Sequence, residues 1–189
     1  MFKQERRLAV WVADAKGPWR YLRDYPVLAA SGGVGPKLRE GDYQVPEGLY
    51  ATENLNPASS YRLSMKVGYP NAFDRLNAAR EHRTRLGGDV FIHGKNVSIG
   101  CVAMGDPAIE ELFTLVAETG IAHTRVIIAA RFAHHVRARR AIDAALDRAA
   151  VAISGRGAPR VPDRARVESR VRCSGHEKGR EGVTRPLRR

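Results

Sequence analysis

The sequence predicts a mainly β domain with one or two helices packed beside it, followed by an irregular basic extension. Three observations carry this prediction. Short apolar segments recur between residues 7 and 130, separated by glycine and proline, a pattern typical of strands joined by turns. One segment, which begins at Asp106, has the apolar spacing of a helix instead. Beyond residue 130 the regular spacing fades and arginine accumulates.

The strands are predicted from alternation and from the turn signals between them. Residues 7–14 alternate apolar and polar positions, and Gly17-Pro18 predicts a turn after them. The segment that follows this turn is therefore expected to run antiparallel to the first strand. Further strands are expected at 49–52, 61–67, 90–92, 99–102 and 124–130. Residues 32–48 are rich in glycine, proline and charge and predict a long surface loop, which in many proteins is functional.

The helix after residue 105 has the clearest boundaries. Asp106 is expected as its N-cap and Pro107 as its first residue, with two glutamates in the first turn. Gly120 is expected to end it. A second helix is expected within 72–86. The predicted buried stripe of the first helix consists of Ile109, Leu112, Phe113 and Val116.

Most of the positive charge lies in residues 131–189. Of the net charge of +12, this segment carries 16 Lys and Arg against 6 Asp and Glu, or +10. We divide the chain into a domain at 1–130 and an Arg-rich extension at 131–189, helical to about residue 151 and disordered beyond. An Arg-rich segment can bind nucleic acid or an anionic membrane surface, but it can equally be solvated without a partner, and we expect no nucleic-acid partner. A shifted reading frame is a third explanation of the extension, which the nucleotide sequence would test.

Several classes of protein are excluded by composition and motif. No run of about 18 apolar residues predicts a transmembrane helix, and the first residues carry no apolar core of a signal peptide. Two cysteines, Cys101 and Cys173, are too few for a disulfide framework and show no metal-ligand spacing. The glycine-rich loop lacks the order of a phosphate-binding motif. We therefore expect neither a metal nor a cofactor.

The candidate active site is a histidine and a cysteine, His93 and Cys101, within residues 89–104. A thiol is a nucleophile as its thiolate, and a neighbouring imidazole can take its proton. A turn centred on Val97 would join the two short strands as an antiparallel hairpin, with His93 opposite Cys101 on one face. We predict Cys101 as the nucleophile and His93 as the proton donor and acceptor. A lone cysteine is more often a buried core residue, so the prediction depends on the combination.

Two neighbours of the cysteine are predicted to support it. Gly100 lets the backbone turn tightly, so that the amides of Gly100 and Cys101 could face a developing oxyanion, where one donor contributes roughly 3 kcal/mol. Ser98 is expected to form the turn, with a bond to substrate as the alternative. Lys95 is expected to be a solvated loop lysine.

The central stretch resembles the signature of the L,D-transpeptidase catalytic domain (YkuD-type) of bacterial cell-wall enzymes, in its YafK-like branch. The motif is Ile92-His93-Gly94, then Ser98-Ile99-Gly100-Cys101, then the acidic helix from Asp106. The segment Gly35-Pro36-Lys37 and the segment Gly68-Tyr69-Pro70-Asn71 are also similar to that branch. The resemblance covers about residues 3–130 and does not extend over 131–189.

This resemblance implies a β-sandwich or barrel whose cysteine attacks a carbonyl in a peptidoglycan stem peptide, at a diaminopimelate L,D bond. Cys101 would form the acyl-enzyme, and an amine or water would resolve it. Many transpeptidases carry arginine or asparagine where this chain has Ala103, so transpeptidation and hydrolysis both stay open, the latter with a wall-attached protein as partner. The resemblance also implies a periplasmic or cell-envelope location and a natural start upstream of Met1. The alternatives are an inactive wall-binding domain and nucleic-acid binding through the extension.

Overall fold

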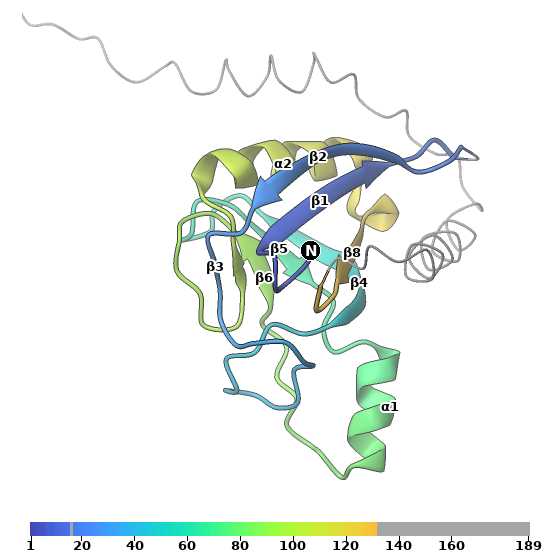
Figure 1. Cartoon of the computed structure of the whole chain (residues 1–189), viewed down its shortest axis with the longest axis vertical. Coiled ribbons are helices and arrows are strands. Elements are labelled where there is room, and N and C mark those ends of the chain that lie inside the picture. The colour runs from blue at the N-terminus through green and yellow to red at the C-terminus, as the bar shows by residue number, and fades with distance from the viewer. Residues whose placement is uncertain (16, 132–189) are drawn as a thin grey trace, which may run out of the picture.

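The computed structural model describes residues 1–15 and 17–131, and these form a mainly β fold with two α-helices (Figure 1). The main sheet is curled and has the strand order β3-β7-β6-β5-β4-β8. The mainly β prediction is confirmed. The strands of this sheet are β3 (Ala29–Ala30), β4 (Gly48–Asn56), β5 (Ser64–Val67), β6 (Phe91–His93), β7 (Val102–Ala103) and β8 (Arg125–Ile128).

A second, two-stranded sheet pairs β1 (Arg7–Val12) with β2 (Arg20–Pro26). The pairing is antiparallel, as the turn at Gly17-Pro18 predicted. This sheet lies against α2 (Asp106–Thr119) (Figure 1). The Arg23 guanidinium and the Tyr25 hydroxyl both donate to Oε2 of Glu111 on that helix, the latter over 2.9 Å. Charge-assisted bonds thus join the small sheet to the helix.

The apolar core packs α2 against the main sheet. The helix contacts β5 and β6, the strands at the centre of the sheet. Of the predicted stripe, Ile109, Leu112 and Val116 are buried, whereas Phe113 is half-buried and Leu115 is buried instead. The predicted face was thus correct except at its edge. The largest fully buried side chains include Tyr50, Ile92, Met104, Ile109 and Ile128.

Both helices differ in detail from their predicted boundaries. Gly105, with φ 81°, is the N-cap of α2 and Asp106 is its first residue, so the N-cap prediction was wrong by one position. The Asp106 carboxylate accepts from the Lys95 amide at 2.8 Å instead, which ties the loop after β6 to the helix. Gly120 ends the helix as predicted. The second helix, α1 (Ala72–Arg80), starts with a capping box at Asn71 and ends before the predicted residue 86.

The predicted antiparallel hairpin is wrong, because β6 and β7 run parallel. Ile92 pairs with Val102, and His93 pairs with Ala103 rather than facing Cys101. The Gly94 amide donates to the carbonyls of Tyr61 and Leu63 across the sheet. After His93 the chain therefore continues past the end of β6, and residues 94–101 return it to the level of the start of β6. From there β7 runs alongside β6, with the Met104 amide donating to the His93 carbonyl at 2.9 Å.

Residues 31–47 form the predicted loop, and α1 lies beyond it, away from the main sheet (Figure 1). The helix expected to about residue 151 and the disorder expected beyond it lie outside the described residues. Within 1–15 and 17–131 no helix is long and apolar enough to cross a membrane.

Candidate active site

His93 ends β6 with its side chain buried, 3% exposed. Its Nδ1 lies 2.6 Å from the Gly94 carbonyl oxygen. Because a carbonyl can only accept, Nδ1 carries the proton and Nε2 keeps its lone pair. Burial lowers the pKa of His93, and the bond to Gly94 opposes that shift without reversing it. The result is a neutral imidazole whose Nε2 can take a proton, which is what a general base requires.

Tyr61 covers the imidazole, and the sequence analysis had not selected it as a site residue. The rings of Tyr61 and His93 have centroids 4.7 Å apart, and the Tyr61 carbonyl accepts from the Gly94 amide at 3.0 Å. Lys95 places its ammonium 5.6 Å from the centroid of the Tyr61 ring. Tyr61 lies in the connection from β4 to β5, far from His93 in sequence. Only the pairing of β5 with β6 brings the two residues together.

Gly94 of the His-Gly motif has a steric role. A Cβ atom there would lie 2.6 Å from Oδ1 of Asp106 and 2.7 Å from the Tyr61 carbonyl oxygen. Real Cβ contacts are essentially never that short. Glycine at this position thus lets the Tyr61 connection and the start of α2 both close on the end of β6.

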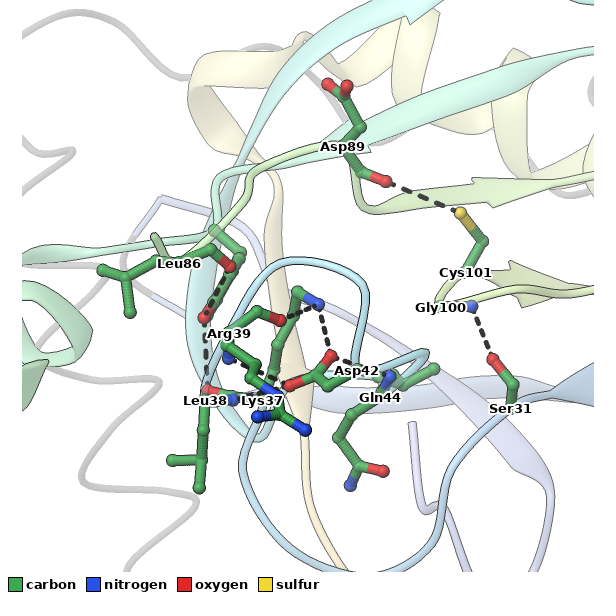
Figure 2. Close-up of polar contacts among 12 residues, drawn as sticks. Ser31, Lys37, Leu38, Arg39, Asp42, Gln44, Leu86, Asp89, Gly100 and Cys101 are labelled. Carbon is green, nitrogen blue, oxygen red and sulfur yellow. Dashed lines mark hydrogen bonds and ion pairs between the residues drawn. The ribbon is translucent and has the colours of Figure 1, made fainter. Parts of the chain in front are cut away.

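Cys101 lies immediately before β7, with its side chain half-buried. Its Sγ lies 3.7 Å from the Asp89 carbonyl oxygen, which it faces in Figure 2. Burial raises the pKa of the Cys101 thiol and the Asp89 carboxylate adds to this, whereas a backbone bond from Phe91 and the charge of Lys37 lower it. The net shift is upward, so the resting thiol is protonated and needs a base.

The parallel pairing, although not predicted, places His93 at the end of β6 and Cys101 directly before the neighbouring strand β7. Ala103 pairs with His93, so Cys101, two residues earlier, falls beside Phe91. Residues two apart on a strand share a face, and His93 and Cys101 are therefore expected on the same face, offset along the sheet. The antiparallel geometry was wrong, and the assignment of His93 and Cys101 as the reactive pair stays a prediction.

The turn that holds Cys101 is closed by two serines. Ser98 Oγ lies 2.7 Å from the Cys101 carbonyl oxygen and accepts from the Cys101 amide at 3.2 Å. The Gly100 amide donates to Ser31 Oγ (Figure 2), and Gly100 has φ 112°, which favours glycine. These contacts favour a turn-forming role for Ser98. Both amides expected at an oxyanion are already bonded, so either would have to exchange its serine partner to serve there.

The loop at 31–47 borders this turn and is organised by one carboxylate. Asp42 accepts from Lys37 at 2.5 Å and from the amides of Leu38, Arg39 and Gln44 (Figure 2). Burial alone would raise the pKa of Asp42, but these bonds lower it to about 2. The next residue, Tyr43, has φ 52°, and its backbone lies 3.9 Å from a Cβ placed at Gly100. The hydrogen-bonded loop around Asp42 thus borders the turn that holds Cys101.

No group of three or more His, Cys, Asp or Glu side chains among the described residues could hold a metal ion.

The family of this chain follows from a match over most of its described part. The family model described as "YkuD: L,D-transpeptidase catalytic domain" matches residues 2–128, and the chain belongs to that family. His93, Cys101 and the glycines between them lie within the matched range.

Among curated proteins, the chain is similar to "Putative L,D-transpeptidase YafK" of Escherichia coli strain K12. The two are 39% identical over 118 residues, which is 61% of this chain and 45% of the relative. The protein of the same name in Escherichia coli O157:H7 matches to the same extent. The chain thus spans less than half the length of the curated relatives it matches.

Among solved structures, the fold is similar to that of the helical cell shape determining protein Pgp2 from Campylobacter jejuni. The TM-score is 0.58 at 22% identity, over 70% of this chain and 47% of the other. Bd1075 of Bdellovibrio bacteriovorus matches with a TM-score of 0.50 at 21% identity, over 78% of this chain and 52% of the other. At these identities the likeness concerns the fold alone.

Proposed function

We propose that this protein is a cysteine acyl-transfer enzyme that acts on the peptide stems of peptidoglycan. The observation that carries the proposal is the state of His93. Its Nδ1 proton is held by the Gly94 carbonyl, and its Nε2 is left as a base on the strand that pairs with β7, which Cys101 directly precedes. Membership of the L,D-transpeptidase family supports peptide stems as the substrate class.

The proton and the electron pairs move between these two residues. His93 Nε2 takes the Cys101 proton as Sγ attacks a stem carbonyl, proposed to be that of a diaminopimelate L,D bond. The tetrahedral intermediate collapses, the C–N bond breaks, and the leaving amine receives the proton from His93. An acyl-enzyme on Cys101 results. A second amine or water, deprotonated by His93, then attacks the thioester carbonyl and releases the thiol.

The second step decides between transpeptidation and hydrolysis. Ala103 stands where many transpeptidases carry arginine or asparagine, is fully buried, and pairs with both Ala29 and His93. This position therefore offers no polar side chain to an acceptor. That absence is compatible with water as acceptor, in which case the substrate would be a bond that attaches a protein to the wall. A site of action in the cell envelope accompanies either outcome, as it does generally in this family.

The test is turnover of muropeptides that carry tetrapeptide stems, with products identified by mass spectrometry. We expect cross-linked or exchanged products for a transpeptidase and shortened stems for a hydrolase. Wall-protein conjugates are tested in parallel. Products should vanish in Cys101→Ala and persist in Cys173→Ala, the matched control. Binding of stems without turnover would overturn the proposal and favour the inactive wall-binding alternative.

A further inference from the structure

Ser31 reaches the cysteine turn from a distant part of the chain. It directly follows β3, whose Ala30 pairs antiparallel with Val102 of β7. Ser31, just after β3, therefore lies opposite Cys101, just before β7. Ser31 Oγ accepts from the Gly100 amide, 69 positions later. Its own amide and its Oγ both lie 3.2 Å from Ser98 Oγ.

The direction of these bonds follows from counting protons. The Cys101 carbonyl can only accept, so the Ser98 hydroxyl proton is committed to it over 2.7 Å. Between the two hydroxyls Ser98 can therefore only accept, and its two lone pairs are shared among the Ser31 hydroxyl and the amides of Ser31 and Cys101, each 3.2 Å away. The Gly100 amide in turn donates to Ser31. A single chain of bonds thus runs from the Gly100 amide through Ser31 and Ser98 to the Cys101 carbonyl.

We propose that Ser31 is a positioning residue for the nucleophile, because it closes this hydrogen-bond chain around Cys101. The chain begins at the Gly100 amide and ends at the Cys101 carbonyl, so it restrains the backbone on both sides of the thiol-bearing Cα. Each bond in such a chain polarises the next and strengthens it.

The consequence for the reaction depends on how precisely Sγ is placed. A displacement of about 1 Å of a reacting group can cost on the order of 100-fold in rate. Removing the Ser31 hydroxyl leaves the Gly100 amide without its acceptor and Ser98 without one of its donors. Ser98 alone would then hold the turn, and a loss of about tenfold in kcat is expected. This inference rests on the proposed function, because it assigns Ser31 a role in positioning the proposed nucleophile.

The first test compares Ser31→Ala with Ser31→Thr and with the control Thr124→Ala. Thr124→Ala likewise removes a half-buried hydroxyl, which donates to the Gly120 carbonyl at 3.1 Å. With muropeptide substrate we expect kcat to fall about tenfold in Ser31→Ala at unchanged KM. Ser31→Thr, which keeps Oγ, should restore most of kcat, and Thr124→Ala should keep it. A folded Ser31→Ala protein with wild-type kcat would overturn the proposal. A higher kcat would also overturn it, since Ser31 would then merely block an oxyanion amide.

The second test needs no substrate and therefore separates this proposal from the proposed function. Amide hydrogen exchange at Gly100 should become at least about tenfold faster in Ser31→Ala, while exchange in the core of α2 is unchanged. Iodoacetamide alkylation, measured on the Cys101-containing peptide so that Cys173 does not contribute, should slow at neutral pH because the thiol is held less often beside its base. Unchanged exchange and alkylation would refute a positioning role. Changes in both without turnover by the wild type would support positioning while the proposed function fails.

Discussion

The protonation states of His93 and Cys101 lead to a specific pH dependence. Burial lowers the pKa of His93 from its usual 6.5 and raises that of the Cys101 thiol from its usual 9.0. Between these values the imidazole is neutral and the thiol protonated, which is the state in which His93 can take the thiol proton. We expect kcat/KM to increase with pH, with a midpoint below pH 6.5, and then to stay level up to about pH 9.

Removal of the base measures what His93 contributes. In His93→Gln the side chain can still form hydrogen bonds but cannot transfer a proton at neutral pH. General-base assistance amounts to roughly 100- to 10,000-fold, equal to about 3–5 kcal/mol of activation free energy. We expect kcat/KM on the plateau to fall by that factor. Activity should then rise with pH toward the thiol pKa, because hydroxide takes over the ionisation of Cys101.

The assay is stem turnover across pH 5 to 10, with His123→Gln as the matched control. His123 is half-buried in the short 3-10 helix η1 (Ile121–His123), outside the candidate site. The reasoning would be refuted by a bell-shaped profile that falls between pH 7 and 8. Such a profile would mean that a thiolate–imidazolium pair, rather than the neutral pair, is the active form.

Three further predictions concern the surroundings of the site. Asp42→Asn should lower the free energy of unfolding by about 2 kcal/mol at pH 7, because the pKa of Asp42 is about 2 in the fold and 3.8 in its ordinary state, which stabilises the fold above pH 4. Urea unfolding should show this difference shrinking as pH falls from about 4 to about 2. A difference that stays constant over this range would contradict the prediction. Asp89→Asn should speed alkylation of Cys101 near pH 8, since the carboxylate raises the thiol pKa; an unchanged rate would exclude that influence. Gly94→Ala should cost about 1–3 kcal/mol in thermal unfolding, because its Cβ would overlap Asp106 and Tyr61, whereas Gly33→Ala, with nothing within 4 Å, should change little.

The sequence was sufficient to propose His93 and Cys101 as the reactive pair but not to predict the strand geometry between them. Alternation and turn signals indicated short strands on both sides of residues 94–101, and the motif selected His93 and Cys101. Whether two short strands pair parallel or antiparallel depends on contacts with a third strand. Here the Gly94 amide bonds to the carbonyls of Tyr61 and Leu63, just before β5, and that contact cannot be seen in the local sequence pattern.

The same limit explains the residues that were missed. Ser31 and Tyr61 meet the site only because β3 pairs with β7 and β5 with β6. Neither has a spacing that links it to His93 or Cys101 in sequence. The helix boundary moved by one residue for a related reason, since the Asp106 carboxylate bonds to the Lys95 amide rather than capping its own helix. Local propensity predicted the elements, and long-range pairing determined which side chains meet.

The measurement that tests the central claim most directly is the mass of the protein after brief exposure to a tetrapeptide-stem muropeptide and acid quench. If Cys101 is the nucleophile, the protein gains the mass of the acyl fragment, and fragmentation maps it to Cys101. The adduct should be absent in Cys101→Ala, unchanged in Cys173→Ala, and form much more slowly in His93→Gln. An adduct of equal abundance in Cys101→Ala, or stem turnover that persists without Cys101, would contradict the account.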